Sequence, residues 1–128
     1  MQITFAPANP AARLVARVVD QDALPANLDS VLVEGAKASR FTGKAGQVFE
    51  GFVGRDGGVV RLALAGIGKT GDADRTAAVE KAGAALTAKY LTSGETELTL
   101  DLAGSSLSAG ETASLLLAAA VFSNGVGC

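Results

Sequence analysis

Residues 62–70 read LALAGIGKT, an apolar run that stops at a glycine-rich turn. The apolar run begins at residue 59 and is nearly continuous, which is typical of a strand that is covered on both faces. We therefore predict a central β-strand at 59–66. The turn that follows resembles the end of a phosphate-binding loop, so the stretch also raises the question of a nucleotide site.

A phosphate-binding loop has the pattern G-x-x-x-x-G-K-[ST], and its first glycine lets the chain leave the strand and wrap the phosphate. Here Gly68, Lys69 and Thr70 match the end of the pattern, but Ala63 stands inside the strand at the place of the first glycine. Asp72 follows closely and would repel phosphate. We interpret the stretch as a strand that ends in a glycine turn. Four residues remain candidates for weak binding of a small anion: Gly66, Gly68, Lys69 and Thr70.

The segments around this stretch alternate between strand and helix patterns. Strands are predicted where apolar and polar residues alternate or β-branched residues gather, at 2–6, 13–19, 47–53, 59–66 and 96–102. Helices are predicted where small and apolar residues recur on one face, at 73–91 and 107–122. The Asp-Gly pair at 56–57 predicts a hairpin. The order of elements predicts an α/β fold with a mixed β-sheet flanked by helices.

Residues 26–40 fit two structures. Apolar and small residues recur there at helical spacing, whereas the β-branched Val31 and Val33 favour a strand. We predict a helix because alanine, glutamate and lysine follow. The later helices are clearer: Ser108 and Glu111 have the spacing of a capping box, and Tyr90 falls on an apolar helical stripe that predicts a place in the core.

The length and composition indicate one globular domain. The chain has 128 residues, and 48% of them are hydrophobic, which is enough for a core without disulfides. We expect the domain to span residues 1–122 and residues 123–128 to form a disordered tail. The single cysteine, Cys128, cannot form an internal disulfide, so a reducing compartment such as the cytoplasm is expected.

The charged residues exclude several kinds of function. There is no histidine, which removes histidine general bases and histidine metal ligands from this chain. The net charge is −2 and the basic residues are scattered, so neither nucleic acid nor a membrane surface is an expected partner. No stretch approaches the roughly 18 apolar residues of a transmembrane helix. The N-terminus does not have the pattern of a signal peptide.

Two segments at a particular spacing carry a resemblance to a known family. RFTGKAGQ at 40–47 precedes the predicted hairpin, and LALAGIGK at 62–69 precedes an alanine-rich helix. In this combination, from about Arg40 to Leu102, the chain resembles the N-terminal domain of the leucyl (cytosol) aminopeptidase family. In that family the segment corresponding to Gly66–Lys69 is a strand-to-helix turn.

The resemblance implies a parent protein with a second, catalytic domain. Members of the family are metallopeptidases that remove N-terminal residues from peptides, usually as hexamers. Their catalytic domain holds two divalent metal ions, zinc or manganese, through a motif similar to N-T-D-A-E-G-R. No such motif occurs here, so the resemblance assigns no catalytic or metal-binding residue to this chain. We expect the chain alone to be inactive and to contain no cofactor.

The resemblance also implies a fold similar to macro domains, with a role in oligomer contacts and, in some bacterial members, in DNA binding. The alternative hypothesis is therefore a stand-alone macro-domain-like module that binds a nucleotide or ADP-ribose. Family members usually continue with an aromatic segment that leads to the catalytic domain. Here only Phe122 remains of it, which fits an excised domain, a truncated reading frame or a stand-alone relative.

Overall fold

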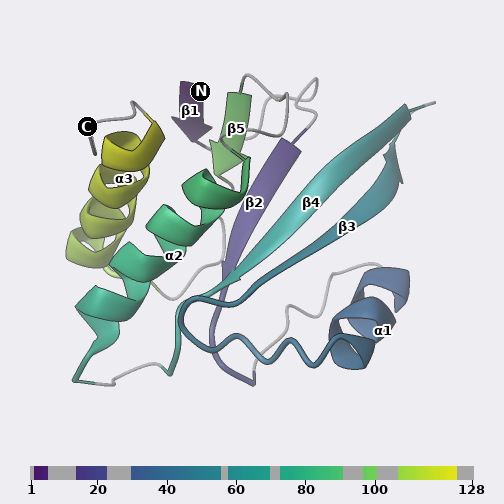
Figure 1. The fold of residues 1–128 in the computed structure, drawn as a ribbon, viewed down its shortest axis with the longest axis horizontal. Helices are drawn as coiled ribbons and strands as arrows, with labels where there is room; N and C mark the ends of the chain where they lie inside the picture. The colour runs from purple at the N-terminus through teal and green to yellow at the C-terminus, as the bar shows by residue number, and fades with distance from the viewer. Residues whose placement is uncertain are drawn as a thin grey trace.

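The computed structural model describes residues 2–5, 14–22, 30–55, 58–69, 73–90, 97–100 and 107–123. Along the chain the elements are β1 (Gln2–Phe5), β2 (Leu14–Val19), α1 (Ser30–Ala38), β3 (Val48–Arg55), β4 (Gly58–Gly66), α2 (Arg75–Tyr90), β5 (Glu97–Leu100) and α3 (Ala109–Ser123). Figure 1 shows α2 and α3 side by side, while the hairpin of β3 and β4 extends away from them. These elements agree in type and order with those predicted from the sequence.

The five strands form one sheet in the order β1-β5-β2-β4-β3. All neighbouring strands are parallel except β3, which pairs antiparallel with β4. Arg55 lies opposite Gly58 in this pair, and the Asp-Gly pair of the predicted hairpin, residues 56–57, lies outside the described residues. The predicted α/β fold with a mixed, helix-flanked sheet is confirmed, and its likeness to macro domains stays a prediction.

Two hydrophobic cores lie on opposite faces of the sheet. The α1-side core contains the buried residues Val15, Val19, Leu32, Ala36, Phe41, Val60, Leu62 and Leu64. The α2-side core contains the buried residues Leu14, Ala16, Val18, Ala63, Ala65, Ile67, Val79, Ala82, Leu86, Tyr90, Leu98, Leu100 and Leu115. Successive residues of β4 alternate between the two cores, which explains why its sequence is apolar almost without interruption.

The ambiguous segment forms a helix over Ser30–Ala38. Leu32 and Ala36 are one helical turn apart, and both are buried, whereas Val31 is 75% exposed. Burial of one helical stripe on the sheet therefore overrides the strand preference of the β-branched residues.

The third helix begins at the predicted capping box. The Ser108 backbone N–H donates to the Glu111 carboxylate at 3.0 Å, and the Glu111 N–H donates to the Ser108 hydroxyl at 3.1 Å. The helix ends at Ser123, and residues 124–128 of the predicted tail lie outside the described residues. Among the described helices, none is long and apolar enough to cross a membrane.

Candidate functional site

The glycine turn, residues 66–69, begins at the last residue of β4, and the backbone N–H groups of its first three residues are already used. The Gly66 N–H donates to the carbonyl of Gln47 at 2.8 Å, and the Gly68 N–H donates to the carbonyl of Gly43 at 3.0 Å. Between them, the Ile67 N–H bonds to the Val19 carbonyl at 3.0 Å. A phosphate-binding loop needs such N–H groups free to face the ligand, whereas here they hold the protein together.

The other two candidate residues of the turn are Lys69 and Thr70. Lys69 is exposed, and Thr70 lies outside the described residues. Weak anion binding at this turn therefore stays a prediction, without support from the two glycine N–H groups.

Gly66 is required by a close approach of two backbones. A side-chain Cβ at this position would overlap the carbonyl oxygen of Lys44 and lie 2.5 Å from the carbonyl carbon of Gly43. Backbone atoms cannot rotate away as a side chain can, so only glycine fits without moving the loop. Gly68 needs its glycine for another reason, since its φ of 74° lies in the left-handed region.

The partner of the glycine turn is the 41–47 loop, whose sequence is FTGKAGQ. The side-chain oxygen of Gln47 accepts hydrogen bonds from the backbone N–H of Thr42 at 3.0 Å and of Lys44 at 3.1 Å. Gly43 has a φ of 91°, and a Cβ there would lie 2.7 Å from the Asp20 carbonyl oxygen. The two glycine-containing segments that stood out in the sequence therefore contact each other directly.

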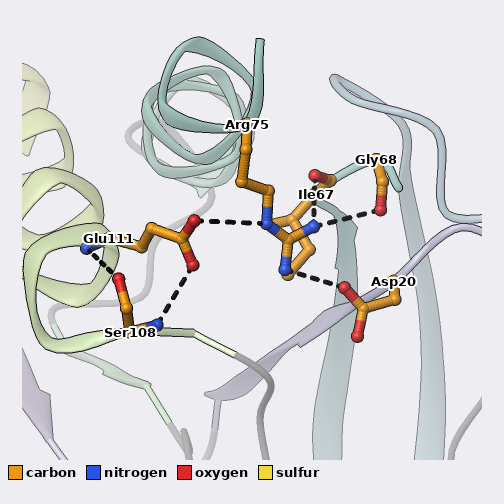
Figure 2. A network of polar contacts seen from close by, with 6 residues as sticks. All are labelled: Asp20, Ile67, Gly68, Arg75, Ser108 and Glu111. Carbon is orange, nitrogen blue, oxygen red and sulfur yellow. Dashed lines mark hydrogen bonds and ion pairs between the residues drawn. The ribbon is translucent and has the colours of Figure 1, made fainter. Parts of the chain in front are cut away.

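A buried arginine at the first residue of α2 completes this junction (Figure 2). Arg75 is only 5% exposed. Its Nη1 donates to the carbonyl oxygens of Ile67 at 2.9 Å and Gly68 at 3.1 Å, and its Nη2 donates to the Asp20 carboxylate at 2.8 Å. The guanidinium fork thus binds the carbonyls of the glycine turn and the end of β2 at the same time.

The same guanidinium connects the junction to α3. Its Nε lies 3.7 Å from the Glu111 carboxylate, whose other oxygen accepts the Ser108 N–H of the capping box (Figure 2). A cation at a helix N-terminus is opposed by the helix dipole. Two carboxylates, from Asp20 and Glu111, offset that cost and the cost of burying the charge.

The sequence analysis missed Arg75. Its partner Asp20 is 55 residues away along the chain, so no local pattern connects them. The available signal was a basic residue at the start of an alanine-rich helix, where a cation is electrostatically disfavoured.

A second polar cluster lies on the α2 side of the β3–β4 hairpin. The Tyr90 hydroxyl donates to the Glu50 carboxylate at 2.6 Å, and Arg61 Nε lies 3.8 Å from the same carboxylate oxygen. The Arg61 guanidinium also stands 5.5 Å from the centre of the Phe52 ring. Burial, together with the hydrogen bond and the charge of Glu50, raises the pKa of Tyr90 far above its ordinary value. The predicted core position of Tyr90 is confirmed, and its hydroxyl keeps its proton and donates a hydrogen bond to Glu50.

A hollow of about 440 Å³ opens beside the first half of β3. It is lined by Ser39, Phe41, Gln47, Val48, Phe49, Glu50 and Lys89. The carboxylate of Glu50, at the wall of this hollow, accepts the hydrogen bond of the Tyr90 hydroxyl.

In each of the two polar clusters, the side chains contact one another. Within the described ranges, no group of three histidine, cysteine, aspartate or glutamate side chains could hold a metal ion. Ser108 and Glu111 are paired with each other, and Asp101 lies outside the described residues. What the arrangement can do is hold β2, β4, α2 and α3 in fixed relation around one buried guanidinium.

Fold and junction together define a small α/β domain whose two glycine-containing segments contact each other directly. The sequence matches the family model described as the cytosol aminopeptidase family, N-terminal domain, over residues 9–123. The chain belongs to this family, as its resemblance predicted. A search of curated proteins found no match.

Proposed function

We propose that this chain is the non-catalytic N-terminal domain of a metal-dependent leucyl aminopeptidase. A separate catalytic domain would hold the two divalent metal ions, manganese or zinc, and would remove N-terminal residues from peptides in the cytoplasm. The role of this domain would be to pack against the catalytic domain and to supply contacts in a homo-oligomer, a hexamer in this family. On its own it would be inert.

The single observation that carries the proposal is the family match over residues 9–123, which covers every described element except β1. The use of the polar side chains supports it. Arg75, Asp20, Glu111 and Ser108 satisfy one another inside the molecule, as Figure 2 shows. A hydrolytic site instead needs charged groups that converge on a space where substrate can sit.

Large apolar side chains on the surface are consistent with a domain that packs against other domains. Phe52 is 57% exposed and Val59 67%, and both lie on the hairpin that extends beyond α2. Leu117 on α3 is also 67% exposed. Single exposed apolar residues are common, but two on one hairpin offer a surface that a partner could cover.

Joining this chain to a catalytic domain of the same family tests the proposal. If this domain packs on the catalytic domain, calorimetry of the joined protein should show its unfolding shifted to a higher temperature than that of the isolated chain. A catalytic domain joined to an unrelated small α/β domain is the control. Two transitions at the temperatures of the separate domains would contradict the packing role.

A further inference from the structure

β3 forms one edge of the sheet, and no described strand lies on its outer side. Gly66 donates its N–H to the Gln47 carbonyl, so Gln47 faces β4. Backbone groups alternate in direction along an antiparallel strand. The residues whose N–H and C=O groups point to the open edge are therefore Val48, Glu50, Phe52 and Gly54.

This edge lacks most of the usual features that prevent pairing. Natural proteins guard exposed edges with lysine, proline, bulges or very short strands. Between Val48 and Gly54 there is no lysine and no proline, and the register with β4 continues without a bulge. The only charge there is Glu50, which is held by Tyr90 and Arg61. The opposite edge strand of the sheet, β1, has only four residues.

Among the described residues of one copy, nothing explains the glycine at position 54. Its φ is not positive, and a Cβ there would have no atom within 4 Å. Gly51 differs, because a Cβ there would overlap the Leu32 side chain. Glycine weakens a strand and often marks a place where another backbone approaches closely. Gly54 shares its face of the strand with the exposed Phe52, since side chains alternate.

The hollow beside β3 follows the strand edge. It is lined by the consecutive residues 47–50, which point alternately to the two faces of the sheet. Phe41 of the α1-side core and Lys89 of α2 close it from opposite faces. Such a hollow leaves room for a neighbouring extended chain at the first half of β3.

We propose that β3 pairs antiparallel with β3 of a second copy of this chain, about a two-fold axis at Gly51. The sheet then continues across the junction, because this symmetry keeps each face on the same side. The strand is complementary to itself in this register. Val48 lies opposite Gly54 of the second copy and Glu50 opposite its Phe52, so no like charges oppose each other.

On the other face, Phe49 lies opposite Val53 of the second copy, and both residues already pack against the α1-side core. The pairing would cover Phe52 and satisfy the outward backbone groups of Val48, Glu50 and Gly54. This inference deepens the assembly role and rests on the proposed function only for its biological setting. Its test uses the present chain alone, so its failure would leave packing on a catalytic domain untouched.

Sedimentation equilibrium of the 128-residue chain tests the pairing. The unmodified chain should form dimers as its concentration rises into the high micromolar range. Phe52→Glu should weaken dimerisation by about tenfold or more, because each new carboxylate faces Glu50 of the second copy. Leu117→Glu, an equally exposed apolar position on α3, should dimerise like the unmodified chain. Circular dichroism of both variants confirms that they are folded.

Cross-linking tests the register itself in a Cys128→Ser background. In the proposed pair, residues 52 of the two copies are diagonal neighbours about 7–8 Å apart. Residues 59 are three strand spacings apart across the sheet and six residues apart along the strands, which separates them by about 25 Å. A short bis-maleimide should therefore join Phe52→Cys chains into dimers and leave Val59→Cys chains largely unlinked.

Three results would overturn the proposal. One is a chain that stays monomeric at high concentration, which would leave the edge to a strand of another protein or of the catalytic domain. Another is a dimer that Phe52→Glu does not weaken, since its contacts would lie elsewhere. The last is equal cross-linking at positions 52 and 59, which would exclude the register.

Discussion

Gly68 donates its backbone N–H to the carbonyl of Gly43 at 3.0 Å, and this bond joins the two segments that characterise the sequence. The 41–47 loop and the glycine turn are far apart along the chain, but each requires the other. Gly66 leaves space for the loop backbone, and Arg75 donates hydrogen bonds to the carbonyls of Ile67 and Gly68. The glycines therefore serve a junction between backbones, and Gly66 and Gly68 use their N–H groups inside it.

Replacing Gly66 with alanine should destabilise the protein by about 2 kcal/mol or more, because the new methyl group meets the backbone of the 41–47 loop. Urea unfolding measures the change. Gly110→Ala is the matched control, since a Cβ there has no atom within 4 Å. A Gly66→Ala variant as stable as the unmodified chain would show that the loop can move aside at little cost.

Arg75→Met should lower the free energy of unfolding by about 3 kcal/mol, because it leaves the Asp20 carboxylate and two turn carbonyls without their donor. Arg75→Lys should recover only part of this, since an ammonium group cannot reproduce the planar fork. Lys69→Met removes an exposed charge close by and should change stability little. Equal effects of Arg75→Met and Lys69→Met in thermal or urea unfolding would contradict the role of the junction.

Ser108→Ala should cost about 1 kcal/mol, the usual effect of losing a helix N-cap. Glu111→Ala should cost more, because Glu111 both caps α3 and faces Arg75. A double-mutant cycle with Arg75→Met separates the two contributions. If Glu111 and Arg75 showed no coupling in this cycle, their 3.7 Å contact would not contribute to stability.

Tyr90 should make stability depend on alkaline pH. Its pKa is raised in the folded state, so above about pH 10 the unfolded chain loses a proton that the folded chain keeps. The free energy of unfolding should therefore fall as pH rises above 10, and Tyr90→Phe should remove this part of the decline. The chain contains one tyrosine and no tryptophan, so tyrosinate absorbance reports on Tyr90 alone. Ionisation near pH 10 in the folded protein would contradict the buried hydrogen bond to Glu50.

Calorimetric titration tests the alternative nucleotide-binding function. We expect no heat of binding from ATP or ADP-ribose at millimolar concentration, because the Gly66 and Gly68 N–H groups are bonded to backbone carbonyls. Saturable heats that Lys69→Met abolishes would instead support an anion site at this turn.

The sequence was informative where a structural cause is local. The apolar run of β4 predicted a strand covered on both faces, and the spacing of Ser108 and Glu111 predicted the start of α3. Helical periodicity also placed Tyr90 in the core. Each of these features depends on residues that lie close together in the sequence.

The sequence did not predict the contacts between residues that meet only after folding. The Tyr90 hydroxyl bonds to Glu50, which is 40 residues away, and Arg75 bonds to Asp20 across 55 residues. Gly66 was predicted as part of a turn. The reason that only glycine fits there is the backbone at Gly43, which lies in another segment of the chain. Such pairs are decided by the order of strands in the sheet, which periodicity does not encode.

We propose that this domain supports a peptidase whose reactive groups lie in another domain. Hydrolysis of leucine p-nitroanilide by the purified chain, with manganese or zinc added, tests it most directly. We predict no turnover above the buffer rate at any concentration of metal. Metal-dependent turnover that survives repurification and scales with the amount of this chain would contradict the claim.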